Sequence, residues 1–260
     1  MTAASSTMRQ FALRSTGIIF LLILWELVSR TNLIDPGLFP PPSQVISALV
    51  SLTLSGQLPK DVFASVLRAV AGFVLGSIAG LFVGAVSGRI RAFDAVLTPV
   101  VQVLRPIPVI ALVPLAIVWF GLGEASKIFL VFWGVFFPVW VSSYLGISRV
   151  DKNYIWAARS IGIRREKLWL QVIVPAALPT IITGLRTSIS LAFIVLVAAE
   201  MAGSYLGVGY RISAYHLVFQ IDKMMGYIVL MGALGFIADR TFAYLVNRAL
   251  PWYQLSVNQD

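Results

Sequence analysis

The sequence predicts an all-α integral membrane protein with about six transmembrane helices. Of its 260 residues, 58% are hydrophobic and only 12% are charged. A soluble domain carries roughly 25% charged residues, so this chain has too few polar groups to cover a surface exposed to water. Its apolar residues form continuous runs of about 20, the helical length that crosses a bilayer, rather than the alternating pattern of a transmembrane β-strand.

Six apolar runs form a single predicted transmembrane domain that covers residues 1–260. They lie at about 15–33, 65–88, 96–120, 128–148, 172–200 and 225–247. The first run is the weakest, because Glu26 interrupts it and Arg30 closes it early. It also resembles a signal peptide, with Arg9 and Arg14 as the basic start, but no small-x-small cleavage site follows it. We therefore favour a retained signal anchor.

The basic residues indicate which loops face the cytoplasm. If the N-terminus is inside, cytoplasmic loops carry more than twice as many lysine and arginine residues as outer loops, which satisfies the positive-inside rule. We therefore expect both termini in the cytoplasm, and the net charge of +9 requires no nucleic-acid partner. The cytoplasmic set is Arg9, Arg14, Arg89, Arg91, Arg149, Lys152, Arg159, Arg164, Arg165, Lys167 and Arg248; the outer set is Arg30, Lys60, Lys127, Arg211 and Lys223.

Glycines recur four residues apart in the second run. Each costs about 1 kcal/mol of helix propensity relative to alanine, but residues four apart lie on nearly the same helix face. In lipid, a face of small residues lets a neighbouring backbone approach closely and promotes helix association. We interpret the run as a packing face, with a surface along which helices slide as the alternative. These glycines are Gly72, Gly76, Gly80, Gly84 and Gly88.

Ionisable and helix-breaking residues at membrane depth are candidates for a translocation pathway. Arg105 precedes a group of prolines, among them Pro108, that should break the third run. Arg186 lies deep in the fifth run, where ionisable residues are functional candidates, and Glu200 closes that run. The alternatives are that Arg105 snorkels to the headgroups, that Arg186 is structural, and that Glu200 pairs with a basic residue or reaches the interface.

The most informative loop spans about 149–171 and is polar and basic. It contains a short amphipathic helix, with Ile155, Ala158 and Ile161 or Gly162 on one face. We expect it to form a knob that projects into the cytoplasm, although a helix lying on the lipid surface is the alternative.

This loop resembles the "EAA" loop of a known family, the permease subunits of bacterial ATP-binding-cassette (ABC) importers. The family pattern is E-A-A, then G, then I-x-L-P; Ala157, Ala158, Gly162 and Pro175 keep its register, while Trp156 replaces the acidic residue. The stretches LRPIPVIALVPLAIVWFGLGEASKIFLVFWGVFFPVW and VPAALPTIITGLRTSISLAFIVLVAAEMAG resemble the nitrate/sulfonate/taurine branch of these permeases.

The resemblance implies a type I ABC importer permease in the bacterial inner membrane. In that family the loop contacts a separate ATP-binding subunit, here expected in two copies that hold the ATP and magnesium. A second copy of this chain and a periplasmic or lipid-anchored solute-binding protein are also implied. The chain itself lacks the G-x-x-x-x-G-K-[ST] phosphate loop, so we do not expect it to be an enzyme. With no cysteine and a single histidine, His216, no metal site or cofactor is expected in it.

The substrate is left open by the sequence. Guanidinium groups such as Arg105 and Arg186 suit oxyanions, which favours an organic sulfonate such as taurine, or a similar small anion. A thiamine precursor, a riboflavin-like molecule or another small heterocycle is the alternative. An ATPase-independent channel or secondary transporter is disfavoured, because the acidic residues within the runs, Glu26, Glu200 and Asp239, lie near their ends.

Overall fold

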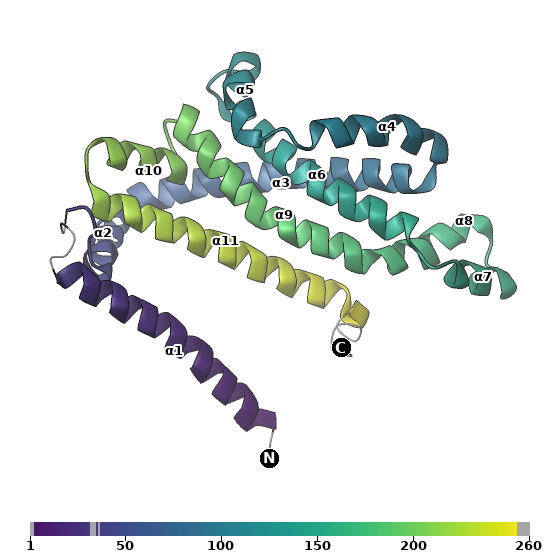
Figure 1. Ribbon diagram of the computed structural model, residues 1–260, viewed down its shortest axis with the longest axis horizontal. Coiled ribbons are helices and arrows are strands. Elements are labelled where there is room, and N and C mark those ends of the chain that lie inside the picture. Colours follow the sequence, from purple (N-terminus) through teal and green to yellow (C-terminus); the bar gives the residue numbers. More distant parts are fainter. Residues whose placement is uncertain (1–2, 32–34, 36, 254–260) are drawn as a thin grey trace.

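The protein is a bundle of helices. Figure 1 shows the computed structural model with its longest axis horizontal. The structure describes residues 3–31, 35 and 37–253, without the side chains of 3–15, 18 and 165. Within this part of the chain every regular element is a helix and no strand is found, as the sequence predicts. Four helices are long and apolar enough to cross a membrane, or five if one bent pair forms a single span.

The first predicted span corresponds to α1 (Ala3–Arg30), which begins earlier than expected; positions 32 and 33 lie outside the described residues. α1 stands apart from the bundle and meets it only at the C-terminal end of α1, beside α2 (Figure 1). There the Trp25 indole donates to the Pro40 carbonyl at 3.1 Å, and the Glu26 carboxylate accepts from the Ser43 hydroxyl at 2.9 Å. Glu26 therefore anchors α1 to the start of α2 (Pro42–Leu54).

Three spans form the centre of the bundle: α3 (Gln57–Arg89), α6 (Glu124–Ser148) and α9 (Val174–Gly203). α6 packs between the other two. The five glycines of α3 lie against α6: a Cβ added at Gly72 would be 2.5 Å from the Val131 Cβ, and one added at Gly84 would be 2.6 Å from the Trp140 carbonyl oxygen. The glycine run is thus the surface through which α3 approaches the α6 backbone.

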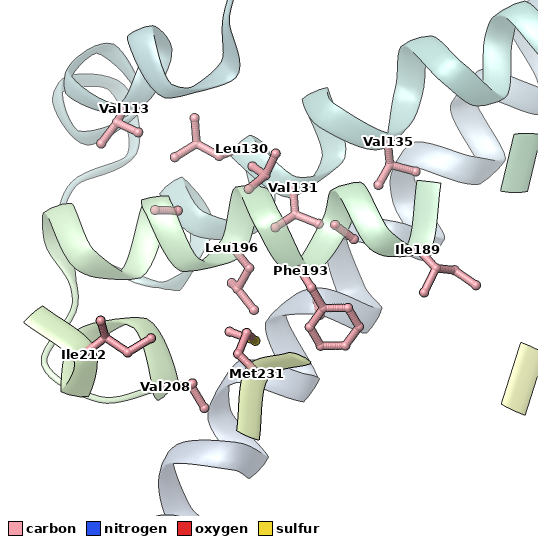
Figure 2. Close-up of a cluster of buried hydrophobic side chains, with 14 of the residues drawn as sticks. Val113, Leu130, Val131, Val135, Ile189, Phe193, Leu196, Val208, Ile212 and Met231 are labelled. Atoms are coloured by element: carbon pink, nitrogen blue, oxygen red, sulfur yellow. The ribbon is translucent and has the colours of Figure 1, made fainter. Parts of the chain in front are cut away.

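Apolar side chains also fill the space between α6 and α9. Figure 2 shows Leu130, Val131 and Val135 facing Ile189 and other residues of α9. The cluster extends to α10 (Val208–Leu217) and to the start of α11 (Ile221–Ala249). The bundle's core therefore lies where α6, α9, α10 and α11 meet.

The third predicted span, 96–120, is broken in the structure. It consists of α4 (Arg91–Leu104), the short 3₁₀ helix η1 (Val109–Leu112) and α5 (Val113–Phe120), and the two halves are bent by 87°. Prolines at 106 and 108 occupy the break, where they cannot donate a backbone hydrogen bond. The sequence indicated a kink here, but the chain turns nearly a right angle.

The remaining elements define the two ends of the bundle. α7 (Lys152–Ser160), α8 (Arg165–Leu168) and the π-helical turn η2 (Trp169–Ile173) form what we call the α7 end, opposite the α10 end with α2 and α10 (Figure 1). α3 and α6 begin earlier than predicted because charged residues, Asp61 and Glu124, lie near their starts, where hydrophobicity alone excludes them. In the structure Asp61 is paired with Arg211 and Glu124 with Arg68.

Candidate functional site

The short helix α7 lies beyond the ends of α6 and α9 (Figure 1). The Asp151 side chain caps its first turn. At its other end Gly162 adopts a left-handed conformation, with φ of 81°. The Gly162 N–H donates to the Arg159 carbonyl and the Ile163 N–H to the Ala158 carbonyl, both at 3.0 Å. This is the Schellman arrangement, so Gly162 is needed for the backbone that ends the helix.

The packed face of α7 includes Ile155 and Ala158, which were expected together on its apolar face. Ala158 is 5% exposed and packs, with partly buried Ile155, onto Leu168, Ile173 and Ala177. Ala158 therefore holds the loop to the start of α9 and has little surface to offer a partner.

The outward face of α7 carries large apolar groups instead. Trp156 is 60% exposed and Ile161 is 78% exposed, and Ala157 is exposed beside them. Ile161 or Gly162 was expected to share the apolar face with Ile155 and Ala158, but both are exposed. Pro175 lies just after the π-helical turn η2, within the continuous span Glu166–Gly203, where it cannot donate a backbone hydrogen bond.

A cavity of about 780 Å³ lies between α9 and α11. One stripe of exposed polar residues on α9 faces it: Thr183, Arg186, Thr187 and Ser190. The Arg186 guanidinium bridges across to the Asp239 carboxylate of α11, with Nε–Oδ1 and Nη2–Oδ2 distances of 2.6 and 2.8 Å. This two-point geometry is the strong form of the arginine–carboxylate interaction.

Arg186 lies near the middle of its span, and its partner Asp239 lies about 15 Å from the last residue of α11. The span that contains Arg186 runs from Glu166 to Gly203, so at 1.5 Å per residue Arg186 is about 30 Å from one end and about 25 Å from the other. The side chains of Arg186 and Asp239 remain 52% and 23% exposed. The pair is therefore both deep and accessible from the cavity.

Glu200 lies in a different place, in a buried polar network at the α10 end. The Glu200 side chain is fully buried and accepts from Arg68 Nη1 at 2.7 Å, from the Ser65 hydroxyl, and from the Gly209 N–H at 2.8 Å. Arg68 also pairs with Glu124 at the start of α6. Three spans, α3, α6 and α9, are thus joined by one guanidinium, and Glu200 does not border the cavity that contains Arg186.

A second buried carboxylate extends this network. Asp61 accepts from Arg211 Nε at 2.9 Å, from the Tyr227 hydroxyl at 2.8 Å and from the Gly207 N–H at 3.1 Å. Burial acts to lower the pKa of Arg211, but its hydrogen bond to Asp61 and the charge of that carboxylate raise the pKa above its ordinary value. The guanidinium therefore stays charged at physiological pH and holds α10 to α3.

The sequence did not reveal the network, although one signal was present. Asp61, Ser65 and Arg68 are spaced by four and three residues, so they lie on one face of α3. This face receives the turn before α10, where Gly207 has φ of 127°. A Cβ added at Gly207 would lie 2.5 Å from Glu200 Oε1, so only glycine fits against the ion pair.

Arg105 and Pro108 lie in the exposed break between α4 and α5. Neither borders the cavity that contains Arg186. The structure therefore does not bring Arg105, Arg186 and Glu200 together: one lies at the break, one in the cavity and one in the buried network.

With this geometry established, we compared the chain with known proteins. Residues 63–250 match the family of binding-protein-dependent transport system inner membrane components. The chain belongs to this family. It is thus the multi-pass permease subunit of an ABC importer, located in the inner membrane.

The permease is similar to other permeases of ABC transporters. It is 36% identical over 232 residues to the Escherichia coli protein named as the aliphatic sulfonates transport permease SsuC, covering 89% of this chain and 88% of that one. It is 31% identical over 250 residues to the E. coli taurine transport system permease TauC, covering 94% and 91%. An inward-facing structure of the MetNI methionine ABC transporter shares the fold, with a TM-score of 0.60 at 17% identity over 72% of this chain and 93% of that one.

Proposed function

We propose that the permease works as a homodimer that moves a small organic sulfonate into the cytoplasm by alternating access. Two ATP-binding subunits would hold ATP and magnesium and drive the cycle. A solute-binding protein would deliver the substrate at the α10 end, and the lipid bilayer would cover the exposed apolar faces. In this arrangement the α7 end and both termini are cytoplasmic.

The exposed apolar surface of α7 carries this proposal. A membrane protein gains nothing from exposing Trp156 and Ile161 to water beyond the ends of its spans, so a partner is expected to cover them. α7 is also attached rigidly: its inner face packs on the start of α9 through Ala158. A push on α7 would therefore reach α9 directly, and with it the cavity that contains Arg186.

The sulfonate assignment has two supports. Relatives with 31% and 36% identity are named for taurine and aliphatic sulfonates. In addition, Arg186 presents a guanidinium to a cavity at mid-span depth, and this group binds tetrahedral oxyanions by paired hydrogen bonds. We place the pathway along Arg186 and extend it to Arg105 and Pro108, which are exposed at the break. Glu200, with no exposed surface, would act by holding the outer ends of the spans together.

The proposal is tested by purifying the permease from native membranes in mild detergent. We expect an ATP-binding subunit to co-purify at one copy per permease, identified by mass spectrometry, and the eluate to hydrolyse ATP. Vesicles that contain the complex and its binding protein should accumulate a radiolabelled sulfonate only with ATP. A permease that purifies alone and transports without ATP would instead be a channel or secondary transporter.

Two tryptophan variants localise the contact. Trp156→Ala should reduce co-purification of the ATPase severalfold, because it removes the largest exposed group on α7. Trp119→Ala is the matched control, since Trp119 is also 60% exposed but lies on α5. Equal loss of the ATPase in both variants would contradict docking through α7.

A further inference from the structure

The Arg186–Asp239 pair suggests more about the substrate than that it is an anion. The pair neutralises itself while the cavity is empty, which allows the Arg186 charge to lie at mid-span depth. An anion that took Arg186 from Asp239 would leave the carboxylate without its bidentate partner. A ligand with a positive group as well would leave neither charge unpaired.

We propose, building on the importer function above, that this cavity binds zwitterions in which an ammonium and a sulfonate are separated by a short carbon chain. The sulfonate would bind the Arg186 guanidinium, and the ammonium would bind the Asp239 carboxylate. The ligand thus inserts between the two partners of the ion pair.

The polar stripe of α9 supports the placement of the ammonium group. The Thr183 hydroxyl donates to the Pro179 carbonyl at 3.0 Å, and the Thr187 hydroxyl donates to the Thr183 carbonyl at 2.9 Å. Their hydrogens are therefore used within the helix, and their oxygens can only accept hydrogen bonds from the cavity. An ammonium group has three donors and no acceptor, so these two oxygens complement it as Asp239 does.

The dimensions also fit a small molecule. A cavity of about 780 Å³ lies within the range of ordinary ligand sites, and both side chains of the pair are partly exposed to it. Arg186 and Asp239 lie on different helices, α9 and α11. Insertion of the ligand would therefore replace a direct link between these helices by a bridged one.

The experiment uses the permease–ATPase complex without nucleotide or binding protein, in lipid nanodiscs. Equilibrium dialysis measures the binding of radiolabelled taurine and its displacement by unlabelled taurine or by ethanesulfonate, which has the same two-carbon chain but hydrogen in place of the ammonium. We expect taurine to bind at least tenfold more tightly than ethanesulfonate. Equal affinity for the two compounds, or no binding of taurine, would overturn the proposal.

Two substitutions separate the roles of the charges. Asp239→Asn keeps the shape of the side chain and one hydrogen bond to Arg186. It should weaken the binding of taurine at least tenfold without weakening the binding of ethanesulfonate. Arg186→Gln should weaken the binding of both compounds. Arg248→Gln is the control, because it removes a charge from α11 outside the cavity lining and should change neither affinity.

An Asp239→Asn complex that keeps the wild-type ratio of affinities would show that the pair only cross-links α9 and α11. Each preparation is checked for co-elution of the ATPase, so a folded complex without taurine preference refutes the zwitterion site and leaves the importer function standing. If no ATPase co-purifies, the importer function fails instead. The same dialysis on the permease alone then decides the zwitterion site.

Discussion

Arg68 on α3 and Glu200 on α9 form an ion pair of 2.7 Å in which the side chains are 4% and 0% exposed. Their charges are fully withdrawn from solvent, yet each has further partners: Glu124 for the arginine, Ser65 and the Gly209 N–H for the glutamate. A buried pair of this kind adds little folding stability compared with apolar residues in the same place. Removing one partner, however, leaves the other charge buried and unpaired, which is strongly destabilising. The pair therefore fixes how three spans and the turn before α10 fit together.

Glu200→Ala should destabilise the folded permease by about 3–5 kcal/mol, the range for a broken buried pair. The measurement is thermal unfolding in detergent, monitored by the loss of the monodisperse peak in size-exclusion chromatography. Arg30→Ala is the matched control, because Arg30 pairs with Glu26 while its side chain is 64% exposed, and such pairs contribute about 0–1 kcal/mol. Similar losses in both variants would mean that the network does not hold the fold.

The α3–α6 contact makes a separate prediction. Gly84→Ala places a Cβ 2.6 Å from the Trp140 carbonyl oxygen, so the helices must separate. We expect the free energy of unfolding to fall by about 1–3 kcal/mol, as at other overpacked sites. Gly232→Ala on α11 has no heavy atom within 4 Å of the added Cβ and should be neutral or slightly stabilising. Thermal unfolding of the two variants side by side tests this, and a neutral Gly84→Ala would refute close packing.

The fold was largely predictable from the sequence, because long apolar runs and small-residue spacing are local signals. The break in the third span was indicated by its prolines, but not its angle of 87°, since packing sets the direction in which a chain leaves a break. Hydrophobicity also misjudged the starts of α3 and α6. Asp61 and Glu124 look like loop residues until their partners, far away in the sequence, are known.

The candidate site was less predictable, for the same reason. Arg186 is conspicuous at its depth in an apolar run, but its partner Asp239 lies on another helix and was placed near a segment end. The inner face of α7 includes Ile163, which follows the left-handed turn at Gly162. α7 ends at Ser160 and Ile161 is only its C-cap, so a helical-wheel argument that includes Ile161 assigns it to the wrong side.

Gly207 gives a third prediction, about the turn that covers the ion pair. Gly207→Ala combines a backbone conformation that side chains rarely adopt with a Cβ 2.5 Å from Glu200 Oε1. Strained backbone alone costs about 1–3 kcal/mol, so the variant should unfold at a clearly lower temperature. Gly123→Ala is the control, with φ of −73° and open space around the added Cβ. If both variants unfold alike, Gly207 has no special role.

Gly162 provides the prediction that links backbone geometry to coupling. The space around it is open, so any effect of a substitution comes from its φ of 81°. Valine should disturb the end of α7, because the left-handed conformation costs a residue with a side chain about 1–2 kcal/mol. Asparagine tolerates this conformation better. We therefore expect Gly162→Val to lower transport per ATP hydrolysed severalfold, and Gly162→Asn to stay near the wild type.

The control for Gly162 lies at the far end of α5. Gly121 has φ of 75° and ψ of −176°, with open space around it, so Gly121→Val introduces backbone strain at least as large away from α7. ATP turnover and sulfonate uptake, measured together in vesicles, separate coupling from folding because an unfolded permease loses both. If Gly121→Val uncouples the complex as strongly as Gly162→Val, the coupling does not pass through α7. If only the Gly162 variant does so, the shape of the α7 terminus carries the signal from the ATPase to α9.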